Sequence, residues 1–192
     1  YDKYRGYIKK KKFIKNFKPT HKVKVLKTRI YKSNNFLPFS SSIEVLKIKD
    51  NYVMFKKNKW IKKKDITFIN KKEKNFIKIF KSYLNCRYKW GGKTFKGIDC
   101  SALIQIYYKF NNKFFPRDTI DQIKYKKGNI TKKKFKLGDI IYWKGHVGVC
   151  INSKELIHAY GPKKKVIIMP IKKTIKRIEE TANLKVKKIY KI

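Results

Sequence analysis

The order of the hydrophobic patterns along the chain constrains its fold more than any other feature. Short alternating runs rich in β-branched and aromatic residues come first and predict strands, at 22–31, 42–48 and 51–55. Helical spacing follows at 69–84 and 100–111, and Asp118 or Thr119 is a suitable N-cap for a short third helix. Further strands are predicted at 139–143, 146–151, 155–159, 166–169 and 184–190. Helices followed by an antiparallel sheet predict an α+β fold with a β-rich unit in front.

Three segments are therefore expected. Residues 69–192 form the α+β domain, and residues 18–68 form a small all-β barrel. Residues 1–17 are interpreted as the tail of a truncated first barrel, because Arg5–Phe13 resembles Asn58–Ile66. Each of these two runs has an aromatic residue, then Ile, then a basic stretch closed by an apolar residue. The alternative is a chance similarity in a lysine-rich chain.

The chain is strongly basic, with 53 Lys and Arg residues against 12 Asp and Glu and a formal net charge of +41. Such a balance indicates a polyanionic partner, for example nucleic acid, anionic lipid or an acidic wall polymer. However, Lys far outnumbers Arg and is spread along the whole length, which is typical of compositional bias and a solvated lysine surface. We expect weak, nonspecific polyanion binding, and a dedicated nucleic-acid binder stays the alternative.

Three cysteines, Cys86, Cys100 and Cys150, are too few and odd in number for a disulfide framework. They fit free thiols in a reducing compartment. No apolar run approaches the roughly 18 residues of a membrane span, and no signal peptide is visible. A cytoplasmic location is therefore expected, with a periplasmic or exported one if an upstream leader was removed. The sequence carries no signal for the oligomeric state.

Cys100 is the first candidate for chemistry. It follows a loop marked by Gly91-Gly92 and opens the amphipathic helix expected at 100–111. A thiol at a helix N-terminus lies at the positive end of the helix dipole, which lowers its pKa and favours the thiolate. A purely structural cysteine would instead be expected in the middle of the helix, on its apolar face.

Two histidines supply the partners that a nucleophilic cysteine needs. His146 opens one predicted strand and His158 lies on the next, and a short Asn-Ser-Lys turn joins the two strands into a hairpin. Adjacent antiparallel strands bring such side chains within hydrogen-bond reach, so one imidazole can take the thiol proton while the other orients it. The alternatives are two inert buried histidines, or a zinc site with Cys100, which lacks the close ligand pairs of structural zinc sites. His21 lies in the β-rich part and is interpreted as incidental.

Several ordered motifs resemble the NlpC-type family of papain-like cell-wall cysteine peptidases. Residues 88–92 read Tyr-Lys-Trp-Gly-Gly and residues 99–103 read Asp-Cys-Ser-Ala-Leu, where the family has Tyr-x-Trp-Gly-Gly and Asp-Cys-Ser-Gly-Leu. Further matches follow in order at 116–119, 137–143, 145–149 and 156–159, so the resemblance covers about residues 70 to 178. Ala102 in place of Gly is a small change inside the helix. Arg87 and Cys86 replace a common Pro and a common small residue outside the expected chemistry.

The resemblance implies a papain-like domain and a role for each matching residue. Cys100 matches the nucleophile and His146 the base. His158 matches the third, orienting polar residue. Tyr88 matches a tyrosine that helps to polarise the substrate carbonyl near the oxyanion site. No cofactor and no metal ion are implied.

The resemblance also implies a reaction and a substrate. Asp99 and Ser101 match positions that hold the free amine of the substrate's N-terminal residue, and a carboxylate there can anchor an ammonium group. The expected activity is hydrolysis of the bond between the γ-carboxyl of D-glutamate and the following diamino acid in murein peptides. Residues 18–68 resemble the bacterial Src-homology-3-like barrels that precede such domains and limit substrates to small peptides with a free N-terminus. The alternatives are an inert wall-peptide binding module, or an acyltransferase or amidase on the same fold.

Overall fold

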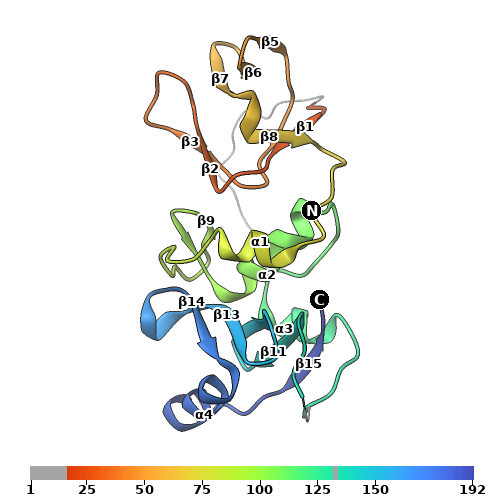
Figure 1. The fold of residues 1–192 in the computed structure, drawn as a ribbon, viewed down its shortest axis with the longest axis vertical. Helices are drawn as coiled ribbons and strands as arrows, with labels where there is room; N and C mark the ends of the chain where they lie inside the picture. Colours follow the sequence, from red (N-terminus) through yellow and green to blue (C-terminus); the bar gives the residue numbers. More distant parts are fainter. Residues whose placement is uncertain (1–16, 132–133) are drawn as a thin grey trace, which may run out of the picture.

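Two units are stacked along the long axis of the molecule, a β-rich unit and a larger mixed unit (Figure 1). The structure, a computed structural model, describes residues 17–131 and 134–192. The interpreted barrel tail at 1–17, apart from Phe17, and its repeat segment Arg5–Phe13 lie outside the described residues. Within the described residues, the helices are all too short or too polar to span a bilayer.

The β-rich unit consists of short antiparallel strands around a small apolar core. One sheet has the order β4-β1-β8, a second pairs β2 with β3, and a third has the order β5-β6-β7. Their bounds are β1 (His21–Val23), β2 (Lys27–Arg29), β3 (Phe36–Pro38), β4 (Ser42–Ile43), β5 (Lys47–Lys49), β6 (Tyr52–Lys56), β7 (Lys59–Lys62), the 3-10 turn η1 (Lys63–Asp65) and β8 (Ile66–Phe68). The core side chains are Val23, Ile43, Val53, Ile61 and Ile66. The predicted strands at 22–31 and 42–48 are each divided in two, because the chain changes its pairing partner within them.

The larger unit is built on an antiparallel sheet with the order β14-β13-β12-β11-β15. Its strands are β11 (Asp139–Trp143), β12 (His146–Cys150), β13 (Glu155–Tyr160), β14 (Lys165–Pro170) and β15 (Lys188–Lys191). Before the sheet come α1 (Phe76–Lys81), β9 (Lys93–Thr94), β10 (Gly97–Ile98), α2 (Cys100–Phe110) and α3 (Thr119–Lys124), and within it come the 3-10 turn η2 (Gly161–Lys163) and α4 (Ile171–Ala182). The expected α+β organisation of this unit is confirmed.

The sheet separates two apolar cores, because successive side chains of a strand point to opposite faces. One core contains α2 and alternate strand residues, among them Ile140, Tyr142, Val147 and Val149. The other core contains α4 and the residues between them, among them Ile141, Trp143, Cys150 and Leu156. The sequence did not predict α4, which buries Ile171 and Ile178 against the second face.

The first helix is much shorter than the predicted 69–84. Its N-cap is Asn75, whose side chain accepts the backbone N–H of Lys78 at 3.2 Å, and the residues just before this cap are not helical. The second and third helices begin at Cys100 and Thr119, where the sequence predicts them.

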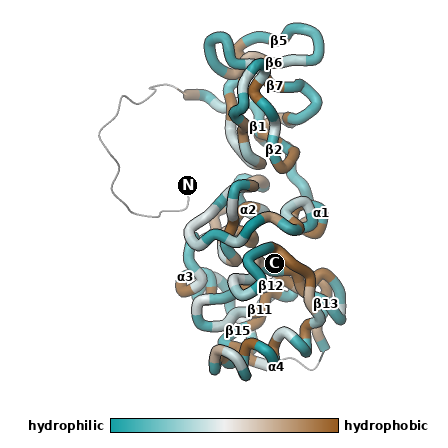
Figure 2. Tube along the Cα trace, turned by 90° about the vertical axis from the view of Figure 1, so that its left-hand side faces the viewer, coloured by the Kyte–Doolittle hydropathy of each residue, from teal (hydrophilic) through white to brown (hydrophobic). Residues whose placement is uncertain are grey.

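The two units meet at the C-terminal end of α2 (Figure 2). Lys22 of β1 is only 1% exposed, and its Nζ donates to the carbonyl oxygen of Phe110, the last residue of α2. Phe39 stacks on the Phe110 ring with a centroid distance of 4.7 Å. Lys72 Nζ donates to the carbonyl oxygen of Asn111 at 2.5 Å. Because the C-terminal end of a helix carries partial negative charge, both ammonium groups stabilise α2.

Candidate active site

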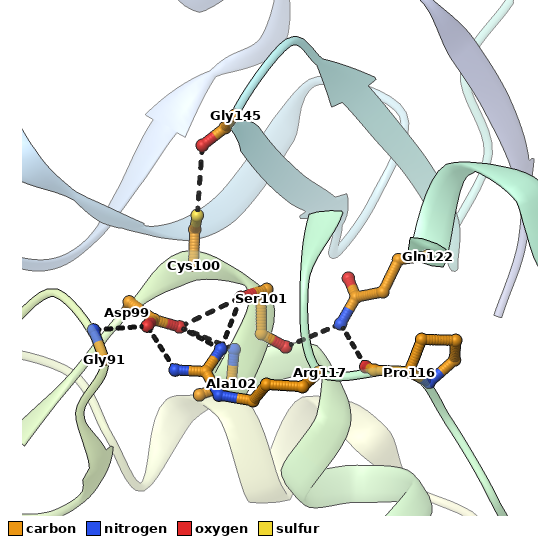
Figure 3. Close-up of polar contacts among 9 residues, drawn as sticks. All are labelled: Gly91, Asp99, Cys100, Ser101, Ala102, Pro116, Arg117, Gln122 and Gly145. Carbon is orange, nitrogen blue, oxygen red and sulfur yellow. Dashed lines mark hydrogen bonds and ion pairs between the residues drawn. The ribbon is translucent and has the colours of Figure 1, made fainter. Parts of the chain in front are cut away.

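Cys100 lies at the first position of α2, and Asp99 fixes the turn before it. Asp99 has extended backbone (φ −99°, ψ 176°), and its Oδ1 accepts the backbone N–H of Ala102 at 2.8 Å, so it caps the helix. The Cys100 side chain points away from α2 toward the turn between β11 and β12 (Figure 3). Its Sγ lies 3.9 Å from the carbonyl oxygen of Gly145 in that turn.

The Asp99 carboxylate is held by a buried arginine. Arg117 donates through Nη1 to Oδ1 at 3.1 Å and through Nη2 to Oδ2, and Nη1 also donates to Ser101 Oγ at 2.7 Å. Gly91 N–H donates to Oδ2 at 2.8 Å, and Ser101 Oγ donates to Oδ1 at 3.1 Å. Asp99 and Ser101 are each 5% exposed and Arg117 is 6% exposed. Their first role in the structure is therefore to fix the start of α2, and their predicted role in holding a substrate amine stays a prediction.

Gln122 of α3 completes this support. It is fully buried, and its Nε2 donates to the carbonyl oxygens of Ser101 at 3.0 Å and Pro116 at 2.9 Å. These bonds join α3, the start of α2 and the segment that carries Arg117 (Figure 3). The residues around the thiol are thus held from three different parts of the chain.

The two histidines form the hydrogen bond that the sequence predicts. His146 begins β12, His158 lies on β13, and the two strands pair antiparallel. Nε2 of His146 and Nδ1 of His158 are 2.9 Å apart. Gly148 lies close to the neighbouring strand, since a Cβ there would lie 3.1 Å from Leu156 Cδ1 and 3.4 Å from His158 Cβ. On its other side, His158 Nε2 lies 3.3 Å from the sulfur of Met169 on β14.

The thiol and the imidazoles are uncharged at neutral pH in this arrangement. Burial raises the pKa of Cys100 to about 11, with a further contribution from the Asp99 charge, and backbone N–H groups of Val147 and of the helix start only partly oppose this. The N–H groups at the helix start lower the pKa of this thiol, as the sequence predicts, but burial and a neighbouring carboxylate outweigh them. The expectation that the helix start favours the thiolate is therefore wrong. Burial lowers the pKa of His146 to about 4. A base must therefore remove the thiol proton as the thiol reacts.

Two cavities are lined by the candidate residues. The first, of about 450 Å³, is lined by Tyr88, Trp90, Gly91, Lys93, Asp99, Cys100, Ser101, Arg117, Asp118, Thr119, Ile120 and Gly145. The second, of about 370 Å³, is lined by Tyr88, His146, Tyr160, Gly161, Pro162, Arg177, Ile178, Thr181, Ala182 and Leu184. Tyr88 lines both. Burial, then the charges of Cys100 and Asp99, raise the pKa of Tyr88, so its hydroxyl keeps its proton and can donate it.

The structure thus brings the predicted residues together in two groups. Cys100, Asp99, Ser101 and Tyr88 share the first cavity, and the two histidines share a hydrogen bond. Among the described residues, Cys100 Sγ donates to the carbonyl oxygen of Gly145 and forms no hydrogen bond with His146. Within that same part of the chain, no cluster of three or more His, Cys, Asp or Glu side chains is placed to hold a metal ion, so the zinc alternative has no site there.

Sequence reasoning assigned no role to Arg117, Met169 or Arg177. Arg117 lies in the motif at 116–119, but its partner Asp99 is distant in sequence and only the fold reveals the pair. Met169 and Arg177 carry no motif signal. Arg177 lies on α4, the helix that the sequence did not predict.

Comparisons with known proteins agree with the motifs. The sequence profile of the NlpC/P60 family matches residues 85–182. A probable endopeptidase NlpC homolog of Haemophilus influenzae is 34% identical over 92 residues, which cover 45% of this chain and 49% of the relative. A gamma-D-glutamyl-L-lysine dipeptidyl-peptidase of Bacillus subtilis is 32% identical over 101 residues, which cover 48% of this chain and 34% of the relative. The chain therefore spans about half or less of the length of these relatives.

The solved structures agree on the fold. A crystal structure of an NlpC/P60 family protein from Bacillus cereus superposes with a TM-score of 0.64 at 24% identity, over 80% of this chain and 58% of the other. NlpC2 from Trichomonas vaginalis gives a TM-score of 0.53 at 19% identity, over 90% of this chain and 72% of the other. At these identities the likeness concerns the fold alone. Since the family profile covers half of the chain and the papain-like fold carries its motifs in order, the chain belongs to the NlpC/P60 family.

Proposed function

We propose that the protein is a cysteine endopeptidase that hydrolyses the γ-D-glutamyl–diamino acid bond of murein peptides. The observation that carries this proposal is the position of Cys100, at the start of a helix and on the wall of a cavity. The adjacent turn, which Sγ contacts at Gly145, leads into β12, whose first residue His146 is hydrogen-bonded to His158. The name of the Bacillus subtilis relative supports the choice of bond.

The proposed mechanism needs one rearrangement at the thiol. Cys100 Sγ leaves the Gly145 carbonyl oxygen and turns to His146, whose Nδ1 is not used by the bond to His158. Nδ1 takes the thiol proton as Sγ attacks the γ-carbonyl carbon. Backbone N–H groups at the start of α2, with the Tyr88 hydroxyl, stabilise the oxyanion. His146 then protonates the leaving amine, and water that His146 activates hydrolyses the thioester.

The residues that line the first cavity support the proposed substrate class. We propose that a free N-terminal amine lies there against Asp99 and Ser101, both of which line it. The Asp99 carboxylate already accepts bonds from Arg117 and from backbone N–H groups, so the amine would share it. A small murein peptide with a free N-terminus is therefore the proposed partner, and the surface lysines add weak nonspecific attraction to polyanions.

Residues 18–68 are proposed to be a Src-homology-3-like barrel that borders the cleft. The contact that supports this position joins Phe36 of β3 and Phe95 of the β9–β10 loop, whose ring centroids are 6.0 Å apart. Lys27 lies over both rings. Lys93 of β9 lines the first cavity, so the β-rich unit contacts the β9–β10 hairpin that contributes to one wall. Recycling of murein fragments in the cytoplasm is the proposed setting, and export is the alternative.

The test is hydrolysis of L-Ala-γ-D-Glu-diaminopimelate under reducing conditions, followed by mass spectrometry. We expect the parent and a Cys86→Ala control to release L-Ala-γ-D-Glu, and a Cys100→Ala variant to release none. Cys86 is a suitable control because it is a half-buried free thiol that lines neither cavity. If folded protein released no product from this peptide or from intact murein, the proposal would be refuted.

An inert wall-peptide binding module is the second candidate, because Sγ contacts Gly145 rather than His146. A binding module should be retained on murein equally well as the parent and as Cys100→Ala, and neither protein should release cleavage products. Transfer of the acyl group to an added amine, in place of hydrolysis, would instead favour the acyltransferase reading.

A further inference from the structure

The second cavity lies on the side of the histidines. His146 and Tyr88 line one part of it, and α4 lines another part through Arg177, Ile178, Thr181 and Ala182. The remaining lining residues are Tyr160, Gly161, Pro162 and Leu184. Cys100 lines the first cavity and not this one, and Tyr88 lines both. A peptide bound across Tyr88 would therefore place its two halves in two different cavities.

The chemistry decides which half lies where. The group that protonates the leaving amine must lie next to that amine, and His146 is that group in the proposed mechanism. The residue that carries the leaving amine therefore lies in the cavity that His146 lines. Its α-carboxyl group is bonded to the same carbon as the amine, so it enters the same cavity.

Arg177 is the charged side chain that this cavity offers to a carboxylate. It is exposed, and among the described residues it forms no ion pair, since the described ion pairs involve other cations. None of the residues that line the cavity is acidic. The planar guanidinium matches a carboxylate with two parallel hydrogen bonds, which an ammonium group does not provide.

We propose that the second cavity is the leaving-group subsite and that Arg177 binds the free α-carboxylate of the departing diamino acid. The inference rests on the proposed peptidase function and adds to it a preference for peptides that end at the diamino acid. A substrate that continues beyond this residue, or that ends in an amide, lacks the carboxylate and loses the contact.

Peptide binding to a variant without the thiol tests this proposal independently of the proposed peptidase activity. Calorimetry with Cys100→Ala would compare L-Ala-γ-D-Glu-L-Lys with its C-terminal amide, and the same pair would be tested in Cys100→Ala/Arg177→Gln. We expect the free acid to bind about tenfold more tightly than the amide, as one charge-assisted contact allows. We expect this ratio to fall to near one in the Arg177→Gln background and to recover only partly in Arg177→Lys.

Lys173→Gln is the matched control, because it removes one exposed cation from the same helix outside the cavity. It should keep the tenfold ratio. An equal ratio with and without Arg177 would overturn the subsite, even if the parent cleaves the peptide. A ratio that depends on Arg177 in a protein that cleaves neither peptide would keep the subsite and reject the peptidase.

A second inference comes from the hydrogen bonds of His158. This side chain is fully buried, and its ring stacks on Tyr160 with a centroid distance of 4.6 Å. Its Nδ1 lies 2.9 Å from His146 Nε2, and its Nε2 lies 3.3 Å from the sulfur of Met169. A thioether sulfur has no hydrogen to donate and can only accept.

We infer that Met169 is a positioning residue that sets the tautomer of both histidines. Because the sulfur only accepts, His158 carries its hydrogen on Nε2 and presents a bare Nδ1. His146 must then donate through Nε2, which leaves its Nδ1 without hydrogen. That nitrogen is the one that the proposed mechanism uses as the base.

Nitrogen-15 NMR of the histidine rings tests this assignment without any substrate. At neutral pH we expect the parent to show protonated Nε2 and bare Nδ1 in both histidines. Met169→Leu removes the acceptor and should populate the other tautomer, whereas Met169→Gln supplies an amide oxygen and should restore the parent pattern. A parent spectrum with hydrogen on His158 Nδ1, or an unchanged spectrum in Met169→Leu, would overturn the inference.

Discussion

Replacing Asp99 with Asn should destabilise the protein strongly, because it leaves Arg117 charged and buried without its counter-ion. The side chains of Arg117 and Asp99 are only 6% and 7% exposed, so solvent does not screen the pair. Asn is almost the same size and caps helices as well as Asp does, so the cap to Ala102 is kept and only the charge is lost. Removing one partner of a buried pair costs roughly 3–5 kcal/mol.

The expected loss is large enough to measure in two ways. At about 2–4 °C for each kcal/mol in a chain of this size, the melting temperature should fall by roughly 6–20 °C. Urea unfolding of the parent, Asp99→Asn, Arg117→Met and the double variant gives the coupling energy of the pair, which should reach about 2 kcal/mol. The double variant should lose less stability than the sum of the two single variants.

An exposed pair on the same protein is the control. Lys176 and Glu180 on α4 lie 3.6 Å apart with side chains that are 75% and 59% exposed. Because solvent screens such a pair, Glu180→Gln should change the stability by less than about 0.5 kcal/mol. If Asp99→Asn were no more damaging than Glu180→Gln, the argument that burial makes the Asp99–Arg117 pair important would be refuted.

Three further predictions concern the protons and the oxyanion. The alkylation rate of Cys100 by iodoacetamide should keep rising above pH 9, since burial raises the pKa of this thiol to about 11. A midpoint of the rate below pH 7 would contradict this prediction. The assay uses Cys86→Ala/Cys150→Ala protein, so that Cys100 is the thiol that reacts. His146 has a folded-state pKa of about 4, below the roughly 6.5 of an unfolded histidine, and burial also lowers the pKa of His158. As the pH falls, the folded state therefore binds fewer protons than the unfolded state. Stability should therefore be lost from about pH 6.5 down to about pH 4, and urea midpoints of His146→Asn/His158→Asn should fall less over that range; equal slopes would refute the linkage. Tyr88→Phe should lower kcat by about 10²-fold with little change in melting temperature, as the loss of one oxyanion donor does, and an unchanged kcat would remove Tyr88 from that role.

Much of the larger unit could be predicted because its signals are local. Asp99 before an amphipathic run predicts where α2 begins, and the short turn after β12 predicts that His146 and His158 lie side by side. The bounds of β11 also agree with the strand predicted at 139–143. In each case a few neighbouring residues determine the conformation, so the sequence alone is sufficient.

The features that could not be predicted depend on contacts between distant residues. The local helix dipole predicts an acidic Cys100, but the packing of β12 over the thiol and the Asp99 charge reverse the direction of the shift. The Arg117 side chain meets Asp99 only in the folded protein. For α4 a local signal did exist, since Ile171, Ile175 and Ile178 have helical spacing directly after Pro170, but the many lysines between them obscure it.

The buried Lys22 links the stability of the β-rich unit to that of the larger unit. Lys22 belongs to the β-rich unit, but its Nζ binds the carbonyl oxygen of Phe110 at the C-terminal end of α2. Asp99 caps the N-terminal end of the same helix, beside the thiol. Removing residues 17–68 would uncover the Phe110 ring and take away the ammonium group at the far end of the helix that carries Cys100. We therefore expect the two units to unfold together, and the larger unit alone to melt at a lower temperature than the whole chain.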